Sequence, residues 1–246
     1  MKAQSASIPR VARALDALAR SQNGAAIDEL AAELEISRPA ALRLFESMIE
    51  TGLAVRTDAK RYRLSLRAYE WGNRSLAAYA PTLPTRQEMA RLAAQIRHRV
   101  WYAVMEGASV VTIERMEFID GLTMSFPVAN RSQWWLSASG MIIAAFSADP
   151  VREELVERAR AGSEMAELTA ALADMRHKGL ARRSYGDLGF AVAAPVLDAS
   201  GYAVGAIGIT TNTEESLIEE DIERQLSESA ARCSHYLGHS RMLFVT

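Results

Sequence analysis

Residues 26 to 64 join two short helical patterns to a basic hairpin, and few soluble domains need those parts in that order. The first helical pattern has one apolar face, because its apolar residues recur at helical spacing: Ile27, Leu30, Ala31 and Leu34. A polar turn over residues 35–37 follows. Ser37 is placed to cap the second helix, and Pro39 suits its first turn, where a missing N–H is harmless. The second helix also has an apolar face: Ala41, Leu44, Phe45, Met48 and Ile49.

The second helix ends at Gly52, and a basic hairpin follows it. Residues 53–56 and 61–64 alternate like strands around a turn over residues 57–60. Between residues 56 and 67 five side chains are basic and only Asp58 is acidic. Basic side chains at a hairpin tip suit contact with phosphates, although this hairpin alone could equally be ordinary solvated surface. The whole series predicts a winged helix-turn-helix, whose second helix enters the major groove of double-stranded DNA.

Length and charge indicate that the DNA-binding role is confined to the first part of the chain. The 246 residues suit one large or two ordinary domains. Residues 1–67 carry 11 Lys/Arg and 8 Asp/Glu, a net charge of +3, whereas the remainder carries 17 and 22, a net of −5. A basic N-terminal segment followed by an acidic remainder is typical of a DNA-binding domain joined to a domain that does not bind DNA.

The chain shows no sign of a membrane or secreted location. No apolar run reaches transmembrane length, and the N-terminus lacks the apolar core of a signal peptide. The single cysteine, Cys233, excludes an internal disulfide framework and fits a reducing compartment. We therefore expect a cytoplasmic protein with no membrane partner.

The apolar patterns along the rest of the chain predict an α+β protein. An amphipathic helix over 8–21 precedes the DNA-binding motif, and a connecting helix over about 66–80 follows it. The second domain mixes strands and helices. Its predicted strands cover 101–106, 110–116, 122–128 and an apolar hairpin within 191–211, and its predicted helices cover 84–98, 137–147, 150–161, 164–178 and 214–240. The expected domains are 1–66, a connecting helix over 67–82, and 83–246.

Short motifs that follow one another in a specific order carry a family resemblance. They are Val11-Ala12-Arg13-Ala14-Leu15, Glu29-Leu30-Ala31, Arg43-Leu44, Tyr62-Arg63-Leu64, Ser137-Ala138-Ser139-Gly140, Arg176-His177-Lys178-Gly179, and Ala193-Ala194-Pro195-Val196-Leu197-Asp198 with Gly201. With them the chain resembles the IclR family of bacterial transcription regulators over almost its full length. The resemblance implies a C-terminal effector-binding domain with a GAF-like α/β fold and a mainly antiparallel sheet. It also implies homodimers or dimers of dimers that bind palindromic operators and respond to a small organic acid or aromatic metabolite.

The chain departs from the family pattern at both predicted sites. Pro39-Ala40 stand where the family usually has Ser-Thr, and Leu42 replaces a polar residue, so base reading is expected to rest on Arg38 and Arg43. In the effector domain Met141 replaces the usual lysine, and the usual acidic pair after Gly179 is absent. The predicted DNA-binding residues are Arg10, Arg13, Ser37, Arg38, Pro39, Ala40, Arg43, Lys60, Arg61 and Arg63.

By position, the resemblance places the effector on the sheet, under the loop that follows the third strand. The predicted effector-binding residues are Met124, Phe126, Trp134, Trp135, Ser137, Ala138, Ser139, Gly140, Ala191, Gly208 and Thr210. A helix N-terminus near residues 137–140 offers N–H groups to a carboxylate, and aromatic walls would hold an apolar body. The small residues Ala191 and Gly208 are expected to leave room above the sheet. We therefore expect an aromatic or otherwise apolar carboxylic acid. Alternatively, both tryptophans pack in the core or at a subunit interface, and the candidate charge partners are solvated: Arg131, Arg182 and Arg183.

No enzyme motif stands out. The chain has no nucleophile elbow, P-loop or zinc-protease motif. His235 and His239 lie four apart on a predicted helix, but no third ligand accompanies them, so no metal and no cofactor are predicted. Two functions of different classes remain. The first is a sequence-specific transcriptional regulator, not an enzyme, whose operator binding a small acid modulates. The alternative is a small-molecule-binding or enzymatic GAF-like protein with a vestigial DNA-binding module.

Overall fold

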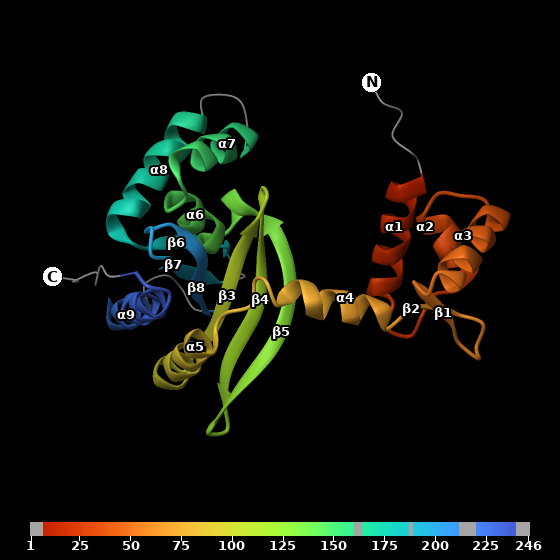
Figure 1. Cartoon of the computed structure of the whole chain (residues 1–246), viewed down its shortest axis with the longest axis horizontal. Helices are drawn as coiled ribbons and strands as arrows, with labels where there is room; N and C mark the ends of the chain where they lie inside the picture. Colours follow the sequence, from red (N-terminus) through yellow and green to blue (C-terminus); the bar gives the residue numbers. More distant parts are fainter. Residues whose placement is uncertain (1–6, 160–163, 187–188, 212–219, 240–246) are drawn as a thin grey trace. The chain divides into compact units, whose positions relative to one another are not determined.

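A computed structural model describes residues 7–159, 164–186, 189–211 and 220–239. Contacts divide the chain into two compact units, Met1–Ala78 and Tyr79–Thr246 (Figure 1). Each unit is described by itself.

The N-terminal unit is a winged helix-turn-helix followed by one further helix. Its elements are α1 (Ser7–Arg20), α2 (Ile27–Glu33), α3 (Arg38–Glu50), β1 (Ala54–Arg56), β2 (Tyr62–Leu64) and α4 (Arg67–Leu76). The apolar faces predicted from helical spacing form its core, where Leu18, Leu30 and Phe45 are almost completely buried. Phe45 packs on Tyr62 of the hairpin, with ring centroids 5.3 Å apart. This aromatic contact joins α3 to the wing.

The wing, formed by β1, β2 and their turn, is also tied to the segment after α1. Ala25 and Tyr62 exchange two backbone hydrogen bonds of 2.8 Å, so a third short strand segment pairs with β2. Gly24 precedes this bridge with φ of +77°, and a Cβ there would lie 2.9 Å from the Tyr62 carbonyl oxygen. Both the backbone angle and the close approach require glycine at this position.

The C-terminal unit is built on one antiparallel sheet with the strand order β5-β4-β3-β8-β7-β6 (Figure 1). The strands are β3 (Arg99–Glu106), β4 (Ser109–Ile119), β5 (Leu122–Gln133), β6 (Ala181–Ser184), β7 (Phe190–Leu197) and β8 (Ala203–Thr211). The helices are α5 (Leu83–Ile96), α6 (Ala138–Ala145), α7 (Asp149–Ala159), α8 (Glu164–Lys178) and α9 (Glu220–Tyr236), with a 3₁₀ turn, η1, at Trp134–Leu136.

Helices cover both faces of this sheet. On one face α6 packs on β7 and β8, with α7 and α8 outside it, whereas α5 and α9 pack together on the other face (Figure 1). All eight residues of α6 are buried, and β7 is buried along its whole length, as its apolar sequence predicts. The α+β class and the mainly antiparallel sheet are confirmed, and every paired strand in the described chain is antiparallel.

Three features differ from the sequence prediction. The strand β6 was not expected, because only Ala181 of its four residues is buried and two arginines follow it. The strand β5 continues to Gln133 instead of ending at residue 128. The Ser37 side chain makes no capping hydrogen bond, although the residue occupies the N-cap position of α3. The predicted helix over 214–240 lies partly outside the described residues; its described part is α9.

The sequence predicted no transmembrane segment, and the structure can be compared with this through the length and hydropathy of its helices. In the described part of the chain no helix is long and apolar enough to cross a membrane.

Candidate functional sites

The outer surface of α3 carries the side chains that sequence analysis assigned to base reading. Arg38, Pro39 and Arg43 are exposed, and Ala40 is half-buried beside them. The opposite face, with Ala41, Phe45 and Met48, is buried in the core. The outward face therefore exposes Arg43 on the first half of the helix.

Three of the predicted DNA-binding arginines already have partners within the unit. The Arg38 Nε lies 2.7 Å from an Asp28 carboxylate oxygen. Arg61 donates from Nε to the Gly24 carbonyl oxygen at 2.9 Å and from a terminal nitrogen to Glu29 Oε2 at 2.9 Å. Arg13 donates to the Glu33 carbonyl oxygen at 3.1 Å. Arg61 thus fastens the wing to the start of α2.

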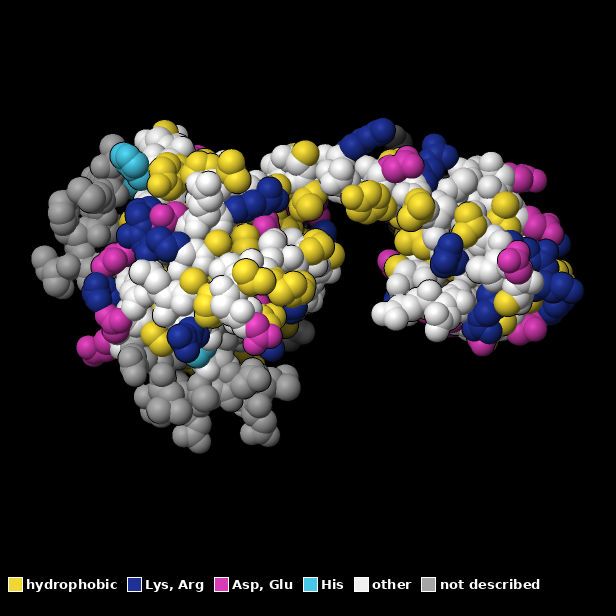
Figure 2. Space-filling model, turned by 90° about the horizontal axis from the view of Figure 1, so that it is seen from below, with side chains coloured by type: hydrophobic (Ala, Val, Ile, Leu, Met, Phe, Trp, Pro, Cys, Tyr) yellow, Lys and Arg dark blue, Asp and Glu magenta, His cyan; other side chains and the backbone are white. Residues whose placement is uncertain are grey.

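The other predicted DNA-binding cations differ from these three in having no side-chain partner among residues 7–78. Among residues 7–78, the side chains of Arg10, Arg43, Lys60 and Arg63 are exposed and make no ion pair or hydrogen bond. Lys60 stands at the tip of the wing with φ of +56°, in a turn closed by its N–H donating to the Thr57 carbonyl oxygen at 2.9 Å. Figure 2 shows basic and acidic side chains interspersed on one side of this unit.

In the C-terminal unit a cavity of about 630 Å³ lies over the sheet, beside the N-terminus of α6. We call it the sheet cavity. Its polar lining consists of Thr112, Asn130, Ser132, Ser137, Ser139, Ser184 and Thr210, its apolar and aromatic lining of Trp101, Val128, Leu136, Tyr185 and Ala191, and its charged lining of Arg115 and Arg183. The volume falls within the range of small-molecule sites.

The charge of the sheet cavity is positive, because both of its charged lining residues are arginines. Arg115 stacks over the Phe126 ring with 5.1 Å between guanidinium carbon and centroid, and its Nε lies 2.9 Å from Glu117. Glu117 is shared with Arg99 at 3.1 Å, so one carboxylate serves two guanidiniums. Arg183 donates to the Trp135 carbonyl oxygen at 3.0 Å and meets no carboxylate among the described residues. The cavity can therefore stabilise an anion.

The polar end of the cavity is preorganised around η1 and α6. Ser137 caps α6, as predicted, by accepting from the Gly140 N–H at 3.0 Å. Burial raises the pKa of Tyr185, and a backbone hydrogen bond from Ala138 and the Arg183 charge partly oppose that rise. The phenol therefore stays protonated at neutral pH and keeps its O–H as a donor.

A bulge and the strand alternation bring the cavity residues together. The register of β4 against β5 shifts between Thr112 and Glu114, which turns Thr112 and Arg115 to the same face in spite of their odd spacing. On β5 the lining residues Val128, Asn130 and Ser132 alternate with outward ones. In the row Arg183–Ala191–Thr210, three neighbouring strands each contribute one residue.

Four of the predicted effector residues line the sheet cavity: Ser137, Ser139, Ala191 and Thr210. Met124 and Phe126 lie on the same face of β5 but nearer its start, because the strand extends beyond its predicted end and the cavity lies over its second half. Trp135 lines a neighbouring cavity instead.

The remaining four are packed within the core and do not line the sheet cavity. Trp134 is fully buried, which favours the core-packing alternative for this side chain, and Ala138 is 1% exposed. A Cβ on Gly140 would lie 2.1 Å from the Trp134 carbonyl oxygen, so this glycine allows η1 to approach α6. A Cβ on Gly208 would lie 2.1 Å from the Trp101 ring, so the indole fills the space that this glycine was expected to leave open.

Sequence reasoning missed Trp101, Arg115 and Tyr185. The Trp101 ring lies against Gly208, and its Nε1 donates to Thr210 Oγ1 at 2.7 Å. Arg115 was hidden by the bulge, which breaks the simple alternation. Of the predicted charge partners only Arg183 reaches the cavity, since Arg131 pairs with Glu106 and Arg182 pairs with Glu223.

Together, the winged helix-turn-helix and the unit with a ligand-sized cavity define a two-domain DNA-binding regulator. The family model for the IclR helix-turn-helix domain matches residues 7–58, and the model for the bacterial transcriptional regulator IclR C-terminal domain matches residues 83–237. The chain belongs to the IclR family of bacterial transcriptional regulators. The alternative of a vestigial DNA-binding module is not favoured.

Solved structures share this fold at low sequence identity. Thermotoga maritima IclR is 20% identical with a TM-score of 0.70, covering 94% of this chain and 98% of that one. An IclR homolog from Microbacterium hydrocarbonoxydans, complexed with 4-hydroxybenzoate, gives the same four values. The Agobacterium tumefaciens repressor BlcR is 21% identical with a TM-score of 0.53, covering 96% of this chain and 98% of that one. No curated protein matches the chain.

Proposed function

We propose that an aromatic carboxylic acid binds in the sheet cavity and modulates the binding of this regulator to its operator. The observation that carries the proposal is that two arginines and no acidic residue line a cavity that also offers Trp101, Leu136 and Tyr185. Arginine pairs well with carboxylates, and aromatic walls suit a ring. A structurally similar protein has been solved with 4-hydroxybenzoate, which is an acid of this class.

Calorimetry with 4-hydroxybenzoate tests the acid site. Arg115→Met keeps the length of the side chain and removes its charge, so affinity is expected to fall about tenfold or more, the loss of one charge-assisted hydrogen bond. Arg131→Met is the matched control, because Arg131 is paired with Glu106 and does not line the cavity. Equal affinities of the two variants for the acid would place the carboxylate elsewhere.

On the DNA side, we propose that Arg43 reads bases and that Lys60, Arg63 and Arg10 contact phosphates. Their exposure and lack of partners among residues 7–78 support this division. Of the other predicted contacts, Pro39, Ala40 and Ser37 would shape the approach of α3 to the groove. Arg43→Ala is expected to remove sequence preference, whereas Lys60→Ala weakens binding to all sequences alike. Gel shifts on specific and scrambled DNA distinguish the two effects, and a reversed pattern contradicts the assignment.

We further propose that the protein acts as a homodimer or dimer of dimers on a palindromic operator in the cytoplasm, through binding and not through catalysis. The helix α4 supports self-association, because no residue of it is buried and it exposes large apolar side chains (Figure 2). Tyr69 is 70% exposed and Trp71 is 46% exposed, with Leu66 beside them at 80%. Sedimentation of the wild type and a Tyr69→Ser, Trp71→Ser variant tests this role; an unchanged dimer in the variant excludes α4 from the interface.

A further inference from the structure

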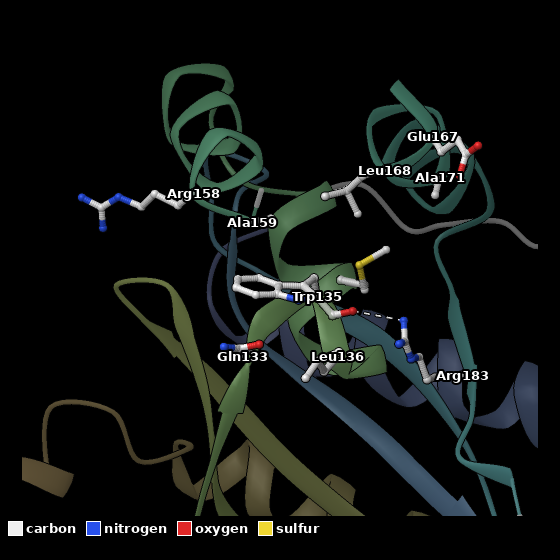
Figure 3. A pocket seen from close by; sticks show the side chains of 10 residues that line it. Gln133, Trp135, Leu136, Arg158, Ala159, Glu167, Leu168, Ala171 and Arg183 are labelled. Atoms are coloured by element: carbon white, nitrogen blue, oxygen red, sulfur yellow. Dashed lines mark hydrogen bonds between the residues drawn. The ribbon is translucent and has the colours of Figure 1, made fainter. Parts of the chain in front are cut away.

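A second cavity of about 730 Å³ lies beside the sheet cavity, between η1, α6, α7 and α8 (Figure 3). We call it the helix cavity. Trp135 and Met141 line it from η1 and α6, Ala159 from α7, and Leu168 and Ala171 from α8. Its volume lies within the roughly 300–1,000 Å³ range of small-molecule sites.

Six of the ten residues that line the helix cavity are apolar: Trp135, Leu136, Met141, Ala159, Leu168 and Ala171. In Figure 3 the guanidinium of Arg158 and the carboxylate of Glu167 point away from the centre, whereas Trp135 and Leu168 project toward it. Arg158 is also held by Glu154, at 2.7 Å. A buried carboxylate would meet only one inward-facing cation here, so this lining favours an uncharged ligand.

Arg183 is the group that the two cavities share. It lines both, and its guanidinium donates to the Trp135 carbonyl oxygen at 3.0 Å, the bond drawn in Figure 3. A guanidinium has five N–H donors, so Arg183 can hold this carbonyl and still offer a donor to one ligand. A carboxylate in the sheet cavity would draw the same donors to its own side.

We propose that the helix cavity is a second small-molecule site, specific for an uncharged aromatic compound with one hydrogen-bond acceptor, and that Arg183 couples it negatively to the acid site. The coupling rests on the proposed function of the sheet cavity, whereas the second site itself does not. An acid that takes the donors of Arg183 leaves the neutral ligand with apolar contacts alone. By linkage, the neutral ligand weakens acid binding by the same factor.

Two substitutions on α8 test the second site, with 2-naphthol as the neutral probe and calorimetry on the full chain. Ala171→Phe fills the helix cavity and is expected to weaken 2-naphthol binding about tenfold or more, while 4-hydroxybenzoate binding stays within about twofold. Ala170→Phe is the matched control, because Ala170, the neighbour of Ala171 in α8, is exposed and does not line the cavity. This variant should bind both compounds like the wild type.

Three outcomes overturn the second site: no 2-naphthol binding by the wild type, equal loss in both variants, or loss of 2-naphthol binding in Arg115→Met with no loss in Ala171→Phe. The last result would place the neutral probe in the sheet cavity. Binding of 2-naphthol that depends on Ala171, without any binding of 4-hydroxybenzoate, would support the second site while the proposed acid site fails.

The coupling is tested by titrating 2-naphthol in the presence of saturating 4-hydroxybenzoate. The wild type is expected to bind the probe about fivefold more weakly, which lies within the usual range of coupling between sites. Arg183→Met should bind 2-naphthol with the same affinity in the presence and absence of the acid. Equal affinities in the wild type, or an undiminished effect in Arg183→Met, would overturn the role of Arg183.

Discussion

Arg61 gives the sharpest test of the DNA-binding unit, because the structure separates it from its neighbour Lys60. Both are basic residues of the wing, but Arg61 is bonded to Gly24 and Glu29 whereas the Lys60 side chain has no partner among residues 7–78. Arg61 is 38% exposed and Glu29 58% exposed in their side chains. We expect Arg61→Ala to destabilise the unit, and Lys60→Ala to leave its stability unchanged.

The magnitude follows from the two bonds of Arg61. The partly buried bond to the Gly24 carbonyl contributes about 1 kcal/mol, and the exposed ion pair contributes about 0.5 kcal/mol after solvent screening. For a unit of this size, a loss of about 1.5 kcal/mol lowers the melting temperature by roughly 6–12 °C. Scanning calorimetry of the full chain measures the shift, and Arg61→Lys, which retains the charge but not the forked geometry, should lose most of the same stability.

The salt dependence of DNA binding provides the second half of this test. Removing one phosphate contact lowers the slope of log K against log salt by about 0.9. Lys60→Ala is expected to lower the slope by this amount, whereas Arg61→Ala weakens binding without changing the slope, because its charge is already paired. A lowered slope together with an unchanged melting temperature for Arg61→Ala would refute the structural role given to this arginine.

Two further predictions concern the C-terminal unit. Gly140→Ala places a methyl group 2.1 Å from the Trp134 carbonyl oxygen, so it should destabilise the fold by at least about 2 kcal/mol in urea unfolding. The control Gly72→Ala on α4 has open space around its Cβ and should be neutral or stabilising. Similar effects of both substitutions would contradict the close packing of η1 on α6. Burial raises the pKa values of Cys233 and Tyr102 to about 12, from ordinary values of 9.0 and 10.0. The unfolded state therefore loses its protons first, and stability falls by about 1.4 kcal/mol per pH unit for each group, above pH 9.0 for Cys233 and above pH 10.0 for Tyr102, until pH approaches 12. Urea unfolding from pH 8 to about 11 should show a shallower decline for the variant Cys233→Ala, Tyr102→Phe, and an identical decline would refute this origin.

The sequence predicted most of the architecture because most elements carry a local signal. The apolar spacing of α2 and α3, the glycine that ends α3 and the basic hairpin all depend on near neighbours. The strand β6 had no such signal. Its one buried alanine is followed by two arginines and a serine, and only pairing with β7 makes these four residues a strand.

The sheet cavity was harder to predict, since its lining comes from strands distant in sequence. Ser137 was correctly predicted as the cap of α6, because an N-cap is a local feature. Gly208 was expected to open space, but a tryptophan on the neighbouring strand fills that space, which no local pattern records. Arg115 lies one residue out of the expected alternation because of the β-bulge. The wrong predictions for the cavity lining therefore come from the register between strands that are distant in sequence.

The central claim is that an aromatic acid in the sheet cavity changes the affinity of the N-terminal unit for DNA. Fluorescence anisotropy of the full chain on DNA from upstream of its own gene, titrated with a series of hydroxylated benzoates, tests it most directly. At least one acid should change the dissociation constant about fivefold or more for the wild type and for Arg131→Met, and should have no effect on Arg115→Met. DNA binding that no acid in the series alters, or that responds equally in Arg115→Met, would contradict the claim.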